Sequence, residues 1–270
     1  MLLLKNKEIK PKIGFIGSDR QNILEDLNFT IENGFDYYEI QGLGEKFDFK
    51  PEVIREAKKI SENNNISLNL HALQFLPISS LIPEISEAAF RFAKREIVLA
   101  NKIGVKRITI HSGHKEMPRR EIAVAKNFKI LIKNLKEIVE FGKKYRIKIG
   151  LENSPANSTG VCVAAKDLLN VVNSVKELGV VFDIGHANTT NLKPVNYFKK
   201  VKDFIINIHI HDNDGTADQH ALIGKGNINF REFLQECKNS HYYGPFILEI
   251  FPKEMALKGK EIFLNLWNQL

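Results

Sequence analysis

The chain has 270 residues, of which 43% are hydrophobic and 26% charged, and a net charge of +7. That length is ordinary for one α/β barrel and provides a large core without covalent cross-links. Cys162 and Cys237 show no paired spacing, which argues against a disulfide framework or a thiolate zinc site and fits a reducing compartment. The first ten residues match neither a signal peptide nor a membrane span. We therefore expect a cytoplasmic protein with a single domain over residues 1–270.

The positive charge has two interpretations. A basic enzyme can bind phosphorylated substrates or nucleic acid. Alternatively, the charge comes from lysines on solvated helix faces. Lysines recur in seven of the eight predicted helices instead of gathering in one segment, which favours the second interpretation.

Short strand-like runs alternate with longer amphipathic runs along the chain. The predicted strands cover residues 12–16, 36–41, 66–71, 105–111, 147–152, 180–183, 204–211 and 246–249. The predicted helices cover 19–33, a segment from Pro51, a segment after the loop 72–83 that ends at 103, 119–145, 165–178, a segment from Pro194, 230–240 and 253–268. Gly34 and Pro51 stand where helices end and begin. Eight strands that alternate strictly with eight helices predict a parallel (β/α)8 TIM barrel.

A doubly wound open sheet is the alternative fold. Such a sheet normally carries a glycine-rich phosphate-binding turn after its first strand. The segment Gly14-Phe15-Ile16-Gly17 lacks the spacing of that turn. A dinucleotide-binding fold is therefore not expected.

Six consecutive predicted strands carry a potential metal ligand at or near their ends. These residues are His71, His111, Glu152, Asp183, His209 and Glu249. In a TIM barrel, the C-terminal ends of the strands form the rim on which active sites are built. A lone histidine at a strand end is more often a satisfied polar residue, but carboxylates and imidazoles that converge are costly to bury without a partner. A bound cation satisfies all of them together, so the joint pattern predicts a metal centre.

Three further candidate ligands follow in the adjacent loops. His186 stands three residues after Asp183, and Asp218 and His220 follow strand seven. Imidazole and carboxylate ligands suit zinc best, with manganese or magnesium as alternatives to it. For His220, the interpretation as a surface loop histidine stays open.

The segment His209-Ile210-His211-Asp212 places two imidazoles on the same face of a strand. We choose His209 as the ligand and Asp212 as a supporting or loop residue. His211 is then a substrate contact or a polar residue of the rim. The same ambiguity applies to His114, three residues after His111.

Several short motifs around these residues carry a family resemblance. They are Leu70-His71-Ala72, Ile110-His111-Ser112-Gly113, Leu151-Glu152-Asn153, Phe182-Asp183-Ile184-Gly185-His186, His209-Ile210-His211-Asp212, Asp218-Gln219-His220 with the following residues to Ile228, and Leu248-Glu249. Together they resemble the xylose isomerase-like TIM-barrel superfamily. That superfamily includes endonuclease IV (apurinic/apyrimidinic endonuclease family 2) and sugar phosphate isomerases and epimerases.

The two branches imply different metal centres. The isomerases and epimerases hold one ion, whose four ligands would correspond to Glu152, Asp183, His209 and Glu249. Endonuclease IV holds three zinc ions with nine ligands, and this chain has a counterpart at every position. The implied nine ligands are His71, His111, Glu152, Asp183, His186, His209, Asp218, His220 and Glu249. The five additional ligands favour the polynuclear branch.

The chain departs from endonuclease IV mainly in the parts that read DNA. Gln74 replaces an aromatic residue, Phe15 replaces a histidine, and the loop Gly42-Leu43-Gly44-Glu45 lacks the basic and polar residues of the DNA-probing loop. The segment 210–217 is also shorter than its counterpart. We therefore expect a small phosphorylated or sugar substrate and no specific binding of duplex DNA.

Three functions remain open at this point. The first is an endonuclease IV-like phosphoester hydrolase, with Glu152 beside the attacking water and His186 in the third metal site. The second is a sugar isomerase or epimerase in which Glu152 and Glu249 form an acid–base pair and His186 contacts the substrate. The third is a non-catalytic metal- or ligand-binding barrel. The candidate substrate contacts are Gln74, His114, Asn153, His211 and Lys225.

Overall fold

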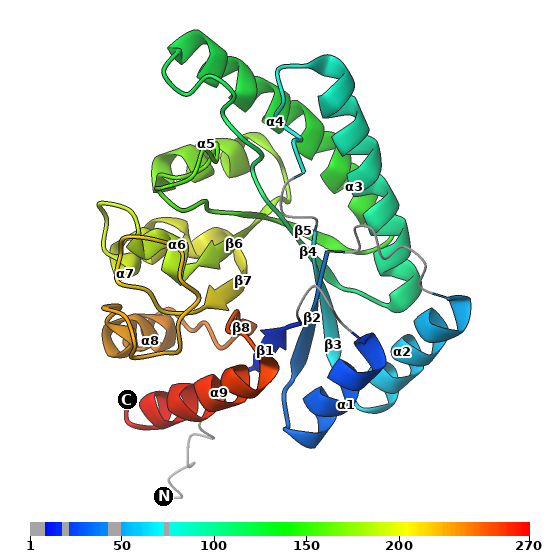
Figure 1. Cartoon of the computed structure of the whole chain (residues 1–270), viewed down its shortest axis with the longest axis vertical. Helices are drawn as coiled ribbons and strands as arrows, with labels where there is room; N and C mark the ends of the chain where they lie inside the picture. Colours follow the sequence, from blue (N-terminus) through cyan, green and yellow to red (C-terminus); the bar gives the residue numbers. More distant parts are fainter. Residues whose placement is uncertain (1–8, 18–21, 43–49, 73–75) are drawn as a thin grey trace, which may run out of the picture.

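Eight parallel strands close into one barrel in sequence order, with β1 paired to β8 (Figure 1). The computed structural model describes residues 9–17, 22–42, 50–72 and 76–270. The strands are β1 Ile13–Ile16, β2 Tyr37–Gln41, β3 Ser67–His71, β4 Arg107–Ile110, β5 Lys148–Glu152, β6 Gly179–Asp183, β7 Ile205–Ile210 and β8 Phe246–Leu248. The predicted (β/α)8 barrel is therefore confirmed. The strand boundaries differ slightly, since β4 and β8 end one residue before His111 and Glu249.

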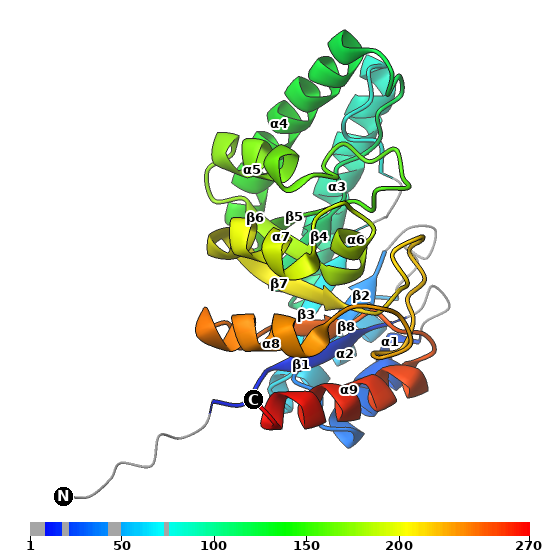
Figure 2. The ribbon, with the colours of Figure 1, turned by 90° about the vertical axis from the view of Figure 1, so that its left-hand side faces the viewer.

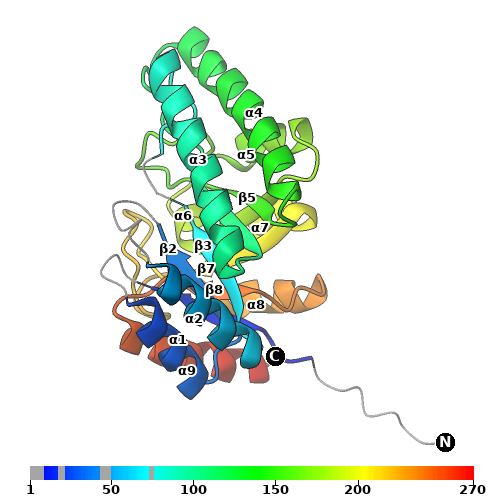
Figure 3. The same cartoon turned by 90° about the vertical axis from the view of Figure 1, so that its right-hand side faces the viewer.

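Helices surround the barrel (Figures 1 and 2). They are α1 Ile23–Glu32, α2 Pro51–Asn63, α3 Pro83–Ile103, α4 Glu121–Lys143, α5 Ala165–Ser174, α6 Ile184–Asn188, α7 Pro194–Val201, the 3-10 helix η1 Lys202–Phe204, α8 Phe230–Asn239 and α9 Lys253–Asn268. The two longest, α3 and α4, lie side by side along one flank (Figure 3). Among the helices of the described ranges, none is both long and apolar enough to cross a membrane.

Local sequence signals explain several helix ends. The side chain of Asn22 caps α1 by accepting from the backbone N–H groups of Leu24 and Glu25. Gly34 follows α1 with a φ of 60°, and α3 ends at Gly104 with a φ of 99°; glycine adopts this left-handed conformation without steric cost. The predicted start of α1 at Asp19 lies outside the described residues.

Helix α6 corrects the prediction of eight helices, because the described ranges hold nine α-helices. We expected a loop directly after β6. Instead, Asp183 ends β6 and also caps α6, with Oδ1 accepting from the backbone N–H of His186 at 2.6 Å. This single turn brings His186 to the same end of the barrel as Asp183.

The core fills the barrel and the layer between strands and helices. Phe15 illustrates why a histidine is missing from the first strand. It is fully buried, and its ring centroid lies 5.4, 5.1 and 5.5 Å from those of Phe29, Phe35 and Tyr38. Burying a phenylalanine side chain stabilises the fold by about 1.5–3 kcal/mol. Phe15 therefore packs in the hydrophobic core and does not contribute a side chain to the rim.

Candidate metal centre

The strand ends bring the six rim residues together as the sequence predicts. His71, Glu152 and Asp183 are the last residues of β3, β5 and β6, and His209 lies near the end of β7. Register places His209 opposite Asp183 in the neighbouring strand. Four of the six are at most 2% exposed and Glu249 is 7% exposed. The barrel thus buries a concentration of ionisable groups at one rim.

The first donor set consists of His71, His111 and Glu152. The Nε2 atom of His111 lies 2.9 Å from Glu152 Oε2, and that of His71 lies 3.6 Å from the same oxygen. The two Nε2 atoms are 3.2 Å apart. Three potential ligand atoms therefore face one point.

The second donor set surrounds Nδ1 of His209. This nitrogen lies 2.7 Å from Glu152 Oε1, 3.1 Å from Glu249 Oε2 and 3.9 Å from Asp183 Oδ2. Glu152 consequently gives one carboxylate oxygen to each of the first two sets. This is the geometry of a carboxylate that bridges two adjacent sites.

The third donor set comes from α6 and from the loop between β7 and α8, which reach the same end of the barrel (Figure 2). The Oδ2 atom of Asp218 lies 3.1 Å from Nε2 of His186 and 3.2 Å from Nε2 of His220. His220 is partly buried and contacts two other members of the centre. The open interpretation as a plain surface histidine is therefore not supported.

Unsatisfied polar atoms test whether these sets fit a cation. Within the described part of the chain, Glu152 Oε2, Glu249 Oε2 and Asp218 Oδ1 are buried without a hydrogen-bond partner. The first two lie 2.9 and 3.1 Å from imidazole nitrogens, but not in hydrogen-bond geometry. Ligands at about 2.1 Å from a tetrahedral zinc ion lie about 3.4 Å apart, close to these spacings. The donor sets therefore fit a metal ion that takes the free lone pairs.

The outer nitrogens of three imidazoles fix their tautomers. In each, Nδ1 donates to a backbone carbonyl, which leaves Nε2 as the nitrogen that faces the donor sets and can bind a metal once its proton is displaced. The pairs are His71 with Ala72 at 3.2 Å, His186 with Asn153 at 2.7 Å and His220 with Glu249 at 3.0 Å. The backbone thus holds these histidines in the form that binds metals.

Burial and mutual charge shift the pKa values of the buried groups. Burial alone would raise the pKa of Glu152, but the charges of His111 and His209 outweigh it and hold that pKa well below its usual range. Burial lowers the pKa of His220, whereas its hydrogen bond to Asp218 and nearby carboxylates raise it to about 9. Without a cation, protons on the imidazoles balance the carboxylates. A metal must displace those protons in order to bind.

Comparison with known proteins identifies the family. The profile of the xylose isomerase-like TIM barrel family matches residues 27–265. The chain belongs to this family. An uncharacterized protein of Methanocaldococcus jannaschii is 32% identical over 256 residues, which cover 90% of this chain and 84% of that protein. The resemblance inferred from the motifs is confirmed.

Relatives in the family carry the names of two kinds of enzyme. A probable endonuclease 4 of Pediococcus pentosaceus is 24% identical over 237 residues, covering 79% of this chain and 78% of the relative. The crystal structure of a D-tagatose 3-epimerase-like protein matches with a TM-score of 0.85 and 29% identity, covering 96% of this chain and 98% of that one. The family assignment therefore indicates an enzyme and leaves the reaction to be argued from the site.

In this family member, His211 lies between the second and third donor sets. It is fully buried, with Nε2 at 3.1 and 3.2 Å from the two oxygens of Asp183 and 3.5 Å from Oδ1 of Asp218. Its ring stacks on His220 with centroids 4.3 Å apart. A Cβ at Gly185 would lie 1.9 Å from Cε1 of His211, so the ring requires glycine there. A substrate contact by His211 stays a prediction.

Asp212 organises the loop that carries the third set. Its carboxylate accepts from the backbone N–H groups of Gly224, Gly226 and Ile228 at 2.8, 2.9 and 3.3 Å. The side chain is fully buried. Asp212 therefore closes the loop on itself and has the loop role that we expected.

Other candidate substrate contacts have different surroundings. Asn153 is fully buried, donates to the carbonyl of Asp183 at 2.9 Å and accepts from its N–H at 2.8 Å. Asn153 therefore ties the end of β5 to the end of β6, and a substrate contact by Asn153 stays a prediction. His114 lies 3.0 Å from Oγ1 of Thr159 and joins two loops, while Lys225 is exposed. Their roles stay predictions.

Two expected features fall on residues that the structure does not describe. Gln74, the remaining candidate substrate contact, lies outside the described residues. So do residues 43–45 of the loop after β2, which the DNA-binding argument used.

Sequence reasoning missed a polar layer directly below the candidate metal ligands. The layer consists of Glu39, Asn69, Thr109 and Asn207, all at most 2% exposed. Three of them stand two residues before a rim histidine: Asn69 before His71, Thr109 before His111 and Asn207 before His209. Alternate residues of a strand share a face, so the period of two was the signal that could have revealed them.

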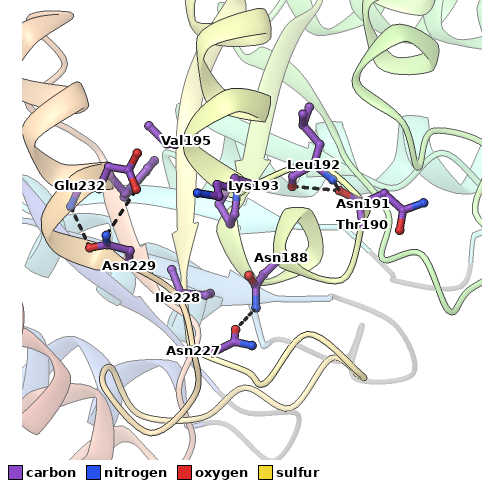
Figure 4. A pocket seen from close by; sticks show the side chains of 12 residues that line it. Asn188, Thr190, Asn191, Leu192, Lys193, Val195, Asn227, Ile228, Asn229 and Glu232 are labelled. Atoms are coloured by element: carbon purple, nitrogen blue, oxygen red, sulfur yellow. Dashed lines mark hydrogen bonds between the residues drawn. The ribbon is translucent and has the colours of Figure 1, made fainter.

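A separate pocket lies beside the centre, between α6, the start of α7 and the start of α8 (Figure 4). Asn188 lines it and donates to Asn227 at 2.7 Å, and Asn229 caps α8 through the N–H of Glu232. None of the nine predicted ligands lines this pocket. It therefore does not belong to the metal centre.

Proposed function

We propose that this protein is a phosphoester hydrolase with two or three zinc-type ions and a small phosphorylated substrate. One observation carries the proposal: nine side chains form three donor sets, with Glu152 shared between the first two. A single cation cannot use nine ligands, since even calcium takes only about eight. Two or three ions beside one another are the arrangement that clamps the attacking and leaving oxygens of a phosphoryl group.

Bound zinc ions would polarise the phosphoryl group and lower the pKa of a water. The residues of the chain then have distinct tasks. We assign to Glu152, which contacts both of the first two sets, the orientation of the attacking water. To His186, Asp218 and His220 we assign the side of the substrate that carries the leaving group.

The substrate is expected to be small. The positive charge is spread over many helices, and a diffuse charge does not select a duplex. Binding to an abasic-site duplex should therefore be weak at physiological salt. A specific complex that survives that salt concentration with a steep salt dependence would contradict this part of the proposal.

The double variant Asp218→Ala/His220→Ala tests the proposal. We expect metal analysis to show fewer ions per chain, phosphoesterase activity to disappear, and the ion held by Glu152 and Glu249 to remain. Asp214→Ala is a matched control, because Asp214 is an exposed carboxylate of the same loop that contacts Thr216 and not the centre. The control should keep the metal count and the activity.

One ion per chain before and after the double substitution would overturn the hydrolase. A sugar isomerase or epimerase would then take first place. Two observations favour that second candidate. One is the similarity to the D-tagatose 3-epimerase-like structure. The other is the approach to His209 of Glu152 from the end of β5 at 2.7 Å and of Glu249 from the residue after β8 at 3.1 Å. These carboxylates would serve as a paired acid and base. Exchange of a substrate carbon-bound hydrogen with solvent would identify this reaction.

A further inference from the structure

Glu39 is a buried carboxylate at the centre of the barrel for which the proposed reaction has no direct use. It lies in β2, where it is fully buried and pairs with Ile16 of β1 and Asn69 of β3. Burying a carboxylate costs several kcal/mol unless hydrogen bonds and charge compensate it. Its surroundings therefore have to explain it.

Four groups contact the Glu39 carboxylate, two at each oxygen. His209 Nε2 and Thr109 Oγ1 lie 3.0 and 3.2 Å from Oε1, and Nδ2 of Asn207 and of Asn69 lie 2.9 and 3.3 Å from Oε2. An ionised carboxylate has about four acceptor positions and no donor. All four positions are thus used. Because the carboxylate has no hydrogen to donate, Nε2 of His209 must carry the hydrogen of this contact.

This contact decides which nitrogen of His209 faces the donor sets. A hydrogen on Nε2 leaves Nδ1 as the atom that can bind a cation, once the cation displaces the proton that Nδ1 shares with Glu152; Nδ1 lies 2.7 Å from Glu152 and 3.1 Å from Glu249. The backbone-anchored histidines His71 and His186 have the opposite arrangement, with Nδ1 donating outward. His209 therefore turns Nδ1 instead of Nε2 toward the donor sets. The side chain of Glu39 accepts from its other nitrogen, where a backbone carbonyl accepts in His71 and His186.

We propose that Glu39 is a positioning residue of the metal centre, which holds His209 in the tautomer and orientation that lets Nδ1 bind the ion of the second donor set. The proposal rests on the metal centre of the proposed function. It applies equally to one ion or three, because His209 belongs to the second set in both candidate reactions. A carboxylate partner also makes a ligating imidazole more basic.

The neighbouring residues supply matched controls. Thr109 donates to the same carboxylate at 3.2 Å, and the described contacts give it no role at the imidazole. Thr109→Val keeps the side-chain shape and removes that donor. Glu39→Gln keeps the shape and an acceptor oxygen while removing the charge. The two variants separate a general disturbance of the buried layer from the specific effect on His209.

Zinc affinity is the first measurement. In competition with a chromophoric chelator, Glu39→Gln should weaken binding at the second set by about 10- to 100-fold, the loss typical for outer partners of metal ligands. The number of ions at saturation should not change. Thr109→Val should bind close to the wild type. Equal affinity in Glu39→Gln and wild type, or an equal loss in both variants, would overturn the proposal.

A second measurement uses the wild-type protein and needs no folded variant. With NMR-active cadmium and isotope-labelled histidine, His209 should couple to the metal through Nδ1 and keep a hydrogen on Nε2, whereas His71 and His186 couple through Nε2. Coupling of His209 through Nε2 would refute the role of Glu39. A single bound ion that couples to Nδ1 of His209 would refute the proposed hydrolase and leave the role of Glu39 intact. Failure of one proposal can therefore be told from failure of the other.

Discussion

The first two donor sets and the third are built by different parts of the fold. Ligands of the first two stand on or directly beside strands, and strand register holds Glu152 and His209 with exposures of 1% and 0%. The third set stands on a one-turn helix and a loop, and the side chains of Asp218 and His220 are 19% and 25% exposed. His220 also has a φ of 47°, a conformation that a non-glycine residue adopts at a steric cost.

This difference implies a hierarchy of metal sites. A barrel strand is held by ladder hydrogen bonds to two neighbours, whereas the loop is held by side-chain bonds, such as those of Asp212 and Asn213, and by a few isolated backbone bonds. Local opening requires less free energy where fewer buried contacts are lost. We therefore expect the third set to bind its ion more weakly and to lose it first.

The largest effect should come from Glu152→Ala, because this residue contacts both strand-borne sets. The variant should lose the ions of the first and second sets, and activity should fall by about 100- to 1000-fold, the order seen when a group that stabilises developing charge is removed. Metal analysis and phosphoesterase assays measure both effects. Retention of the full metal content would show that the strand-borne sets do not share this carboxylate.

Acid should have the next largest effect, by weakening metal binding at the third set. The pKa of His220 is raised to about 9, so below that pH the metal-free imidazole carries a proton that a metal must displace. Each pH unit below the pKa then weakens binding about tenfold per displaced proton. Between pH 8 and pH 6, the proton on His220 alone should lower the affinity of the third set about 100-fold, and the raised pKa of His186 in the same set makes the fall steeper. Chelator competition across this range measures it, and a flat profile would contradict a role of His220 as ligand.

Asp212→Asn should have the smallest effect and should be confined to the loop. Its Oδ2 accepts from Gly224 and Gly226, and an amide nitrogen at that place leaves one or both backbone donors unsatisfied. The expected destabilisation is about 1–3 kcal/mol, measured by urea unfolding. Weaker binding at the third set with the other two unchanged would show that the loop holds the third set independently of the strands. Loss of the second-set ion would contradict that independence.

The sequence reveals some parts of this site more readily than others. Rim residues such as His71, Glu152 and Asp183 were predictable, because each ends an apolar run and parallel strands deliver their ends to one rim. Glu39 was not predicted, since it stands inside a strand and its partner His209 lies 170 positions away. Helix α6 was missed because a single turn has no amphipathic period, and only the cap of Asp183 on the N–H of His186 defines it.

The sequence by itself determined the barrel and pointed to the candidate metal ligands. Alternating strands and helices, glycine and proline at helix ends, and a polar residue after each apolar run are local patterns that any conformation of the chain retains. Only the tertiary structure decided how nine donors divide into three sets, which nitrogen of His209 faces them and how Asp212 closes its loop. These depend on register between distant strands and on side-chain directions, which exist only once the barrel has closed and water has been excluded.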